Sequence, residues 1–279
     1  MNKKFIAILA LCTIACTGGK TGVDDFSNNE SYYRIHPHGA FLCFIDDDGG
    51  QYFPEVWGEI METTGIRVGI ACIAGMMSGA VTPLPAYAQM SIEQLRGYYD
   101  AGCEVYSHSW SHKSFRNVAT LQEIDEECRK SKDWLMANGF TRNVDAIVYP
   151  GGMNVADSPG KKNVIRRHYR YGIATVDSYN GVNREPLDEL FISRCQGDKS
   201  TLEELKERVD AAFAENKMLV VMTHAYELMG YGQVNTTKEE SIARLVGMIQ
   251  YAQSKGVTVI PLEEAIHEIY GWDFRSNDF

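Results

Sequence analysis

The chain has 279 residues, of which 44% are hydrophobic and 23% are charged, and its formal net charge is −10. This composition is typical of a globular protein and excludes a disordered, collagen-like or coiled-coil chain. Lysine and arginine never occur in runs longer than two residues. Together with the negative net charge, this leaves no basic face for a phosphate backbone, so we expect no nucleic-acid partner.

The N-terminal segment has the pattern of an export signal. Lys3 and Lys4 precede an apolar run over residues 5–15, which is too short to span a bilayer but suits the core of a signal peptide. Ala15 and Cys16, followed by polar residues, resemble a bacterial lipoprotein cleavage box, in which the cysteine is lipidated and becomes the new N-terminus. Ordinary secretory cleavage is the alternative.

These patterns divide the chain into four parts. We predict a signal peptide over residues 1–15, a lipidated or flexible tether over 16–38, one catalytic-type domain over 39–270 and a C-terminal tail over 271–279. The expected location is the cell envelope, in the periplasm or at the cell surface. An N-terminal lipid anchor would hold the domain at a membrane.

Short apolar runs alternate with amphipathic patterns along the predicted domain. Such runs indicate buried strands of a mostly parallel sheet. The predicted strands lie at residues 40–45, 67–73, 104–106, 146–149, 172–176, 190–192, 218–222 and 257–260. Seven or eight strand-then-helix units predict a closed or nearly closed α/β barrel in a single domain, with a doubly wound sheet as the alternative.

Four intervening segments begin with a serine or threonine that is followed three residues later by glutamine or glutamate. This spacing is that of a capping box, which predicts where a helix starts. The pairs are Ser91 with Gln94, Thr120 with Glu123, Ser200 with Glu203, and Thr236 with Glu239. We therefore expect helices to begin at these four points.

Polar clusters follow several predicted strands, at the ends where α/β enzymes carry their active sites. These clusters are Asp46-Asp47-Asp48-Gly49, the pair His108 and His112, Tyr149-Pro150-Gly151-Gly152, and Thr223-His224. Adjacent carboxylates raise each other's pKa unless a cation intervenes. The placement therefore indicates one active site assembled from several loops.

His108 and His112 are four positions apart and face the same way if the chain turns helically there. With a nearby carboxylate they form a three-ligand metal site that keeps an open position, as catalytic zinc sites do. An Asp-His-His set suits zinc and also accepts cobalt, nickel or manganese. The alternative is two capping or surface histidines beside a solvated acidic turn.

The ordered set Asp47-Asp48-Gly49, His108-Ser109-x-x-His112, Tyr149-Pro150-Gly151-Gly152 and Thr223-His224 resembles the polysaccharide deacetylase family, the NodB-homology carbohydrate esterases. The resemblance spans about residues 40–265. It implies a distorted (β/α) barrel of about seven units and a divalent metal. It also implies a hydrolase that removes acetyl groups from acetylated sugars.

The resemblance assigns a role to each matching residue. Asp47 is the implied catalytic base and Asp48 the implied metal-binding carboxylate, with His108 and His112 as the other ligands. His224 is the implied general acid. The run of three acids allows a slip of one position, because Asp46 and Asp48 share a face if the strand stays extended.

Further roles follow from the same resemblance. The backbone N–H of Gly151 matches the family's oxyanion donor. The family's third motif normally begins with an arginine that orients the base, and Val148 stands at that position here. Arg194, just after a predicted strand, is our candidate for the missing cation, and a surface charge is the alternative reading.

Aromatic side chains at the same strand ends are candidate substrate contacts, because aromatic rings stack on sugar faces. These are Trp110, Tyr149 and Tyr226. The function expected from the sequence is metal-dependent deacetylation of an N- or O-acetylated glycan. The alternatives are a catalytically inactive carbohydrate-binding lipoprotein on the same fold, and a related hydrolase of a non-glycan amide.

Overall fold

The computed structural model describes residues 39–270, apart from short stretches inside that range. The stretches outside the described residues are 117–119, 153–157, 176–179, 184–186 and 233–234. The predicted signal peptide, Cys16, the tether and the C-terminal tail also lie outside them, so those assignments stay predictions. In the described part of the chain, no helix is both long and apolar enough to cross a bilayer.

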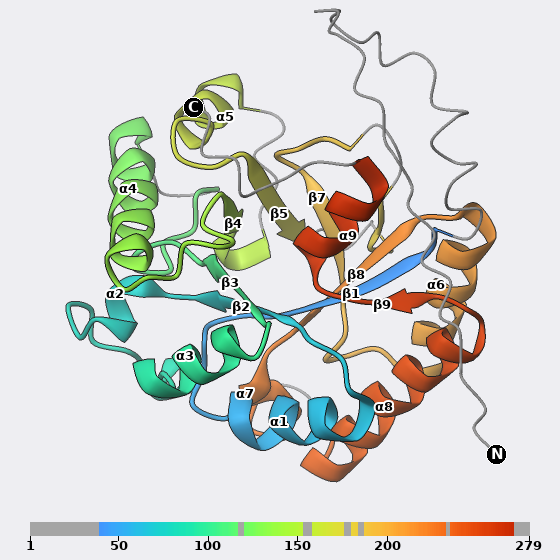
Figure 1. Ribbon diagram of the computed structural model, residues 1–279. Helices are drawn as coiled ribbons and strands as arrows, with labels where there is room; N and C mark the ends of the chain where they lie inside the picture. The colour runs from blue at the N-terminus through green and yellow to red at the C-terminus, as the bar shows by residue number, and fades with distance from the viewer. Residues whose placement is uncertain are drawn as a thin grey trace, which may run out of the picture. The chain divides into compact units, whose positions relative to one another are not determined.

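Within the described residues, seven parallel strands close into a barrel, in which the last strand pairs back with the first (Figure 1). In order around the ring they are β1 (Phe41–Asp46), β2 (Gly69–Cys72), β3 (Glu104–Ser107), β4 (Ala146–Val148), β5 (Tyr171–Thr175), β7 (Ile192–Gln196) and β8 (Met218–Thr223). Two short strands, β6 (Val182–Asn183) and β9 (Thr258–Val259), pair with β8 and β1. The predicted α/β barrel is confirmed, and the doubly wound sheet is excluded.

Helices surround this barrel (Figure 1). They are α1 (Phe53–Thr64), α2 (Ala74–Met77), α3 (Ile92–Asp100), α4 (Leu121–Ala137), α5 (Pro159–Ile165), α6 (Leu202–Glu215), α7 (Ala225–Leu228), α8 (Lys238–Ser254) and α9 (Leu262–Tyr270), with short 3-10 turns at Pro85–Tyr87 and Pro150–Gly152. Helix α9 covers the end where the strands begin, because Leu262 and Ile266 share a buried cluster with Phe41 and Met218. The opposite end, where the strands finish, carries the site.

Alternation along β1 decides which way its side chains point. Leu42 and Phe44 belong to the buried cluster between the barrel and its helices, whereas Cys43 and Ile45 belong to the cluster inside the barrel. Successive side chains of a strand point to opposite faces. Asp46, the last residue of β1, therefore faces outward toward the helices.

The pairing of strands differs in extent around the barrel. β1 and β8 pair over their full lengths, from Phe41 opposite Met218 to Asp46 opposite Thr223. Between β3 and β4 only Ser107 opposite Ile147 is paired. This uneven pairing distorts the barrel, and it brings the ends of the first and last long strands side by side.

Two of the four predicted helix starts are wrong by one residue. The helices at Ser91 and Thr120 begin as predicted, each with a complete capping box. Helix α6 is capped by Thr201 rather than Ser200, and α8 by Thr237 rather than Thr236. The sequence fits both registers, because a second hydroxyl residue and a second glutamate follow the first pair by one position in each case.

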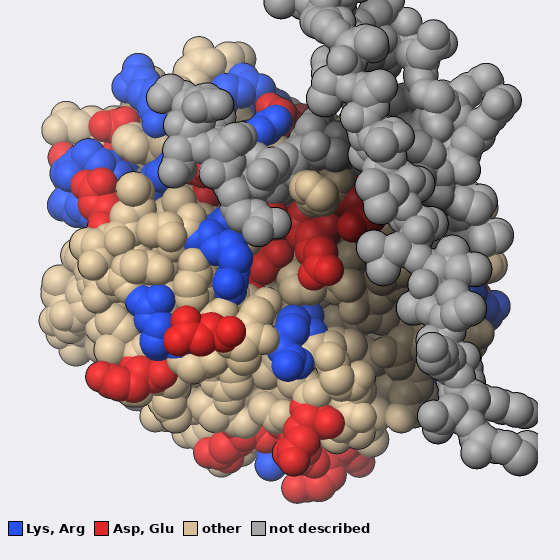
Figure 2. All heavy atoms as spheres, in the orientation of Figure 1, with Lys and Arg blue, Asp and Glu red and all other residues tan. Residues whose placement is uncertain are grey.

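Charged side chains on the face shown in Figure 2 lie in small groups of mixed sign, separated by uncharged surface. Helix α4 carries ion pairs such as Arg129 with Asp133 at 3.1 Å and Lys132 with Asp145 at 2.6 Å. An exposed pair such as Arg129 with Asp133 contributes little to stability. Such pairs neutralise the positive charges locally, which weakens the long-range attraction of a polyanion.

Candidate metal centre and active site

Asp48, His108 and His112 come together where β1 and β3 end. One ligand atom from each lies within 4.8 Å of the others. The Nε2 atoms of His108 and His112 lie 3.5 Å and 3.4 Å from Oδ1 of Asp48. That oxygen is buried and has no hydrogen-bond donor within the described residues. A buried carboxylate oxygen that faces two imidazole nitrogens fits a divalent cation. All three atoms are metal ligands, and none donates a hydrogen bond to another.

His108 is held in the tautomer that a metal ligand needs. Its Nδ1 lies 2.8 Å from the backbone oxygen of Val148, so Nδ1–H donates and the lone pair of Nε2 faces Asp48. Burial is the main reason why the pKa of His108 falls to about 3. The imidazole is therefore neutral at physiological pH, as metal binding requires.

The charge of Asp48 also favours a bound cation. Burial raises the pKa of Asp48 to about 7, and the neighbouring charges of Asp47 and Asp198 add to this effect. Without a cation, this carboxyl would hold a proton near neutrality. A positive ion at the three ligands would offset both the burial and the repulsion between the acids.

The loops that carry the ligands are strained at specific residues. Asp48, Ser109 and His112 have positive φ angles of 74°, 62° and 61°, although none is glycine. Such conformations cost about 1–3 kcal/mol each and persist only where the surroundings enforce them. Here Oγ of Ser109 accepts from the backbone N of His112 at 3.1 Å, and Glu127 of α4 accepts from both the backbone N and the hydroxyl of Ser111.

Asp47 forms a buried ion pair with Arg194 of β7. Nη1 and Nη2 of the guanidinium lie 2.6 Å and 2.9 Å from the two carboxylate oxygens. Burial alone would raise the pKa of Asp47, but the charge of Arg194, with help from His108, lowers it to about 2. The alternative reading of Arg194 as a surface charge is wrong, because its side chain is fully buried.

Arg194 reaches Asp47 because of its position on β7. Ile192, two residues earlier, lies in the cluster inside the barrel, so Arg194 points to the same interior. Val148, where the family arginine is expected, is itself a buried member of that interior cluster. The guanidinium therefore enters from another strand, and the space near Val148 is filled by apolar side chains.

His224 follows β8 and is paired with an acid that sequence reasoning missed. Asp198 accepts from the backbone N of His224 at 2.9 Å, and its other carboxylate oxygen lies 2.7 Å from Nδ1. Burial would lower the pKa of His224, but the hydrogen bond and charge of Asp198 raise it to about 10. The remaining ring nitrogen, Nε2, lies 4.0 Å from Asp47.

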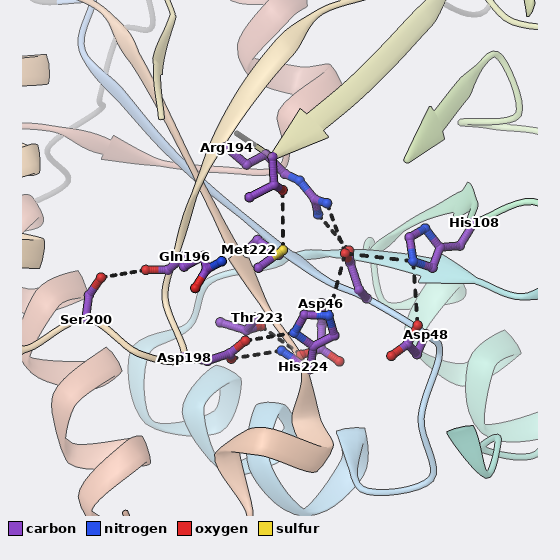
Figure 3. Close-up of polar contacts among 12 residues, drawn as sticks. Asp46, Asp48, His108, Arg194, Gln196, Asp198, Ser200, Met222, Thr223 and His224 are labelled. Atoms are coloured by element: carbon purple, nitrogen blue, oxygen red, sulfur yellow. Dashed lines mark hydrogen bonds and ion pairs between the residues drawn. The ribbon is translucent and has the colours of Figure 1, made fainter. Parts of the chain in front are cut away.

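Arg194, His108 and His224 come from three different strands or strand ends and reach into one small region (Figure 3). Asp198 follows β7, which ends at Gln196 rather than at the predicted residue 192. The sequence signal for Asp198 is an acidic residue just after a strand end, and it becomes visible only when the end of β7 is predicted at Gln196.

Asp46 faces Trp57 and Thr223 rather than the metal-ligand set. Its Oδ1 accepts from Nε1 of Trp57 at 3.0 Å and from the hydroxyl of Thr223 at 2.7 Å. The strand ends at Asp46, and the positive φ of Asp48 turns the chain. The extended strand that would place Asp46 and Asp48 on one face is therefore absent, and of these two residues it is Asp48 that lies close to His108 and His112.

The other predicted site residues have different surroundings. Gly151 has a φ of 70° in the turn that follows β4, and its oxyanion role stays a prediction. Trp110 is half-buried, with its backbone oxygen accepting from Gly75 at 2.8 Å. Tyr226 is half-buried on α7. Tyr149 as a substrate contact is wrong: its ring is fully buried in the core, and its hydroxyl donates to the backbone oxygen of Leu190 at 3.0 Å.

The three-ligand arrangement predicts how metal binding responds to mutation. Removing a residue that only hydrogen-bonds to a metal ligand typically weakens metal binding 10- to 100-fold. His108→Ala or His112→Ala removes a ligand itself, so we expect zinc affinity to fall by about 100-fold or more. Titration calorimetry with Zn²⁺ measures the affinity, and circular dichroism checks the fold. His168→Ala removes a histidine that contacts Asp125 elsewhere and serves as the control. Stoichiometric tight binding by both site variants would contradict the ligand assignment.

The Asp47–Arg194 pair predicts a pKa change in a known direction. Arg194→Met removes the charge that favours ionised Asp47, so the pKa of Asp47 should rise from about 2, with each unit corresponding to about 1.4 kcal/mol. Arg194→Lys keeps the charge but loses the two-point contact, and should give a smaller rise. Carboxyl-carbon NMR titration measures both. An unchanged titration of Asp47 in Arg194→Met would rule out this role.

One known protein family resembles this chain in sequence. The sequence profile of the polysaccharide deacetylase family matches residues 44–169. A search of curated proteins gave no match.

Solved structures share the fold at low sequence identity. An allantoinase matches with a TM-score of 0.60 and 15% identity, over 91% of this chain and all (100%) of the other. A family 4 carbohydrate esterase from Streptomyces lividans, in complex with acetate, matches with a TM-score of 0.52 and 12% identity, over 79% and 91%. A family 4 pseudoenzyme from Bacillus anthracis matches with a TM-score of 0.52 and 16% identity, over 84% and 67%. Residues 44–169 are therefore similar to the polysaccharide deacetylase family, and the solved structures share the fold of this chain.

Proposed function

We propose that the protein is a metal-dependent hydrolase that removes acetyl groups from an N- or O-acetylated glycan. The observation that carries this proposal is the joint arrangement of three metal-ligand atoms, the Asp47 carboxylate paired with Arg194, and the His224 ring paired with Asp198. The family match supports the substrate class. A divalent metal bound by Asp48, His108 and His112 would lower the pKa of water and polarise the acetyl carbonyl. Zinc suits these ligands, and cobalt, nickel or manganese are the other candidates.

Asp47 is proposed as the general base. Its pKa of about 2 keeps it ionised at neutral pH, so it can accept a proton from the attacking water. Arg194 fixes both carboxylate oxygens and thereby sets the direction in which the carboxylate faces. This side chain supplies the orienting cation that Val148 cannot, which favours an active enzyme over an inactive carbohydrate-binding relative.

His224 is proposed as the general acid. The pKa of about 10 keeps the ring protonated, and the hydrogen bond with Asp198 directs Nε2 away from that acid. A protonated imidazole can donate its proton to the sugar nitrogen or oxygen as the bond between that atom and the acetyl carbon breaks. The backbone N–H of Gly151 is the proposed donor to the oxyanion of the tetrahedral intermediate.

A hydrolase of a non-glycan amide is the second candidate, since the same fold occurs in an allantoinase. Acetate release separates the candidates. The metal-loaded protein is incubated with chitooligosaccharide, peptidoglycan and acetylated xylan, and acetate is assayed enzymatically. Release from at least one glycan supports deacetylation. Release from none of them would reject the proposed activity.

Substitutions of the three aspartates test the assigned roles. Asp47→Asn should keep metal affinity and lose turnover by at least about 100-fold, because an amide cannot accept the water's proton. Asp48→Asn should weaken metal binding as well, since an anionic ligand is lost. Asp46→Asn should affect both less. Zinc calorimetry and acetate release are measured together for each variant. Normal turnover in Asp47→Asn would exclude this mechanism.

We also propose that Cys16 carries a lipid and anchors the domain to a membrane of the cell envelope. The support is the sequence around Cys16, which resembles a lipoprotein cleavage box. If this is correct, the expressed protein should partition into the detergent phase, and Cys16→Ser should release it or stall its processing. Recovery of the unmodified protein entirely in the aqueous phase would reject the anchor.

A further inference from the structure

Helix α4 presents two buried polar side chains to the segment 108–112, which carries both histidine ligands and is called the ligand loop below. Glu127 and Ser131 are four positions apart, so they lie on the same face of the helix. The hydroxyl of Ser131 lies 2.8 Å from that of Ser107, the last residue of β3. Glu127 is the charged residue among the buried side chains of α4. A buried carboxylate needs hydrogen-bond donors, because burial removes its water.

The donors to Glu127 both come from Ser111 of the ligand loop. Oε2 of Glu127 accepts from the backbone N of Ser111 at 2.8 Å, and Oε1 accepts from the Ser111 hydroxyl at 2.6 Å. Hydrogen bonds to an ionised acceptor are stronger than those between neutral groups. Ser111 directly precedes His112 in the sequence. This two-point contact therefore fixes the chain one residue away from a metal ligand.

A second helix, α2, binds other backbone groups of the ligand loop. The backbone N of Ala74 donates to the carbonyl oxygen of Ser109 at 3.3 Å, and that of Gly75 donates to the carbonyl oxygen of Trp110 at 2.8 Å. The loop is thus held through two carbonyl oxygens by α2 and through an amide and a hydroxyl by Glu127 of α4. The backbone between the two histidine ligands is fixed by contacts to two helices.

The conformation of the ligand loop needs this support. Ser109 and His112 have φ angles of 62° and 61°, which residues other than glycine rarely adopt unless the surroundings enforce them. Removing the Glu127 carboxylate would leave the Ser111 amide without its acceptor. The loop would then relax toward ordinary backbone angles, and His112 would turn away from Asp48.

We propose that Glu127 is a positioning residue that keeps His112 in place before a cation binds, and thereby raises the affinity of Asp48, His108 and His112 for a divalent metal. This inference rests on the metal site of the proposed function. A ligand that is already in place loses less conformational freedom on binding, so the affinity is higher. Glu127 touches neither the metal ligands' donor atoms nor the reacting groups, and acts through Ser111.

Titration calorimetry of the protein with Zn²⁺ tests this role. Glu127→Ala should weaken zinc affinity by about 10-fold or more, as is typical when a residue that orients metal ligands is lost. Glu127→Gln keeps one acceptor oxygen and should recover part of the affinity. Ser111→Ala loses the hydroxyl but keeps the backbone N–H, so it should weaken zinc binding less than Glu127→Ala. Circular dichroism checks that each variant is folded.

Glu126→Gln is the matched control. It removes the same charge from the next residue of α4, where Glu126 pairs with Lys130 near the surface, and should leave zinc affinity unchanged. Wild-type zinc affinity in folded Glu127→Ala would overturn the inference. If Glu127→Ala does not fold, Glu127→Gln and Ser111→Ala decide: weaker zinc binding than in Glu126→Gln supports the inference, and wild-type affinity in both overturns it.

A double-mutant cycle separates positioning through Ser111 from a general loss of stability. Ser111→Ala should have little further effect on zinc affinity in the Glu127→Ala background, because the partner of its hydroxyl is already gone. Fully additive losses would overturn the inference. Acetate release by the wild-type protein is measured separately. Zinc binding that depends on Glu127, without acetate release, would support the positioning role and reject the proposed deacetylation.

Discussion

Three consecutive aspartates at the end of one strand are the constraint around which this site is built. Three carboxylates in a buried position repel one another, and each needs its own compensation. The structure provides three separate ones. Asp46 turns outward to Trp57 and Thr223, Asp47 turns inward to Arg194, and Asp48 turns to the two histidines. Strand alternation separates the first two, and the positive φ of Asp48 separates the third.

This division gives each carboxylate a different chemical state. Burial raises the pKa of Asp46 well above its usual value, with only partial compensation from its hydrogen bonds. Asp47 stays ionised beside a guanidinium, and Asp48 has a buried oxygen free for a cation. Groups of one type whose surroundings drive their pKa values apart are typical of acid–base catalysis.

The sequence predicted the barrel well, because short apolar runs between capped helices leave few alternatives. The metal set could also be predicted, since histidines four apart after a strand are uncommon. The sequence did not predict that β7 extends to Gln196. The strand Leu190–Ile192 was placed too early because Ser193, Arg194 and Gln196 are polar, although all but Gln196 are buried. Asp198 was missed for that reason. Tyr149 was misassigned because an aromatic residue at a strand end has the same sequence signal whether it faces the ligand or the core.

The pairing of β1 with β8 has a consequence for when this site can exist. The family profile covers residues 44–169, which contain Asp47, Asp48 and both histidine ligands, but Arg194, Asp198 and His224 lie beyond it. Arg194 lies on β7, which pairs with β5 and β8, and His224 follows β8, which pairs along the whole of β1, a contact between segments more than 170 residues apart in sequence. Contacts of such long range form late, because the intervening loop must be closed first. His224, the proposed general acid, is therefore brought next to Asp47 by the pairing of β8 with β1, the contact that closes the ring. The strand pairing that closes the barrel thus also joins the two halves of the candidate site.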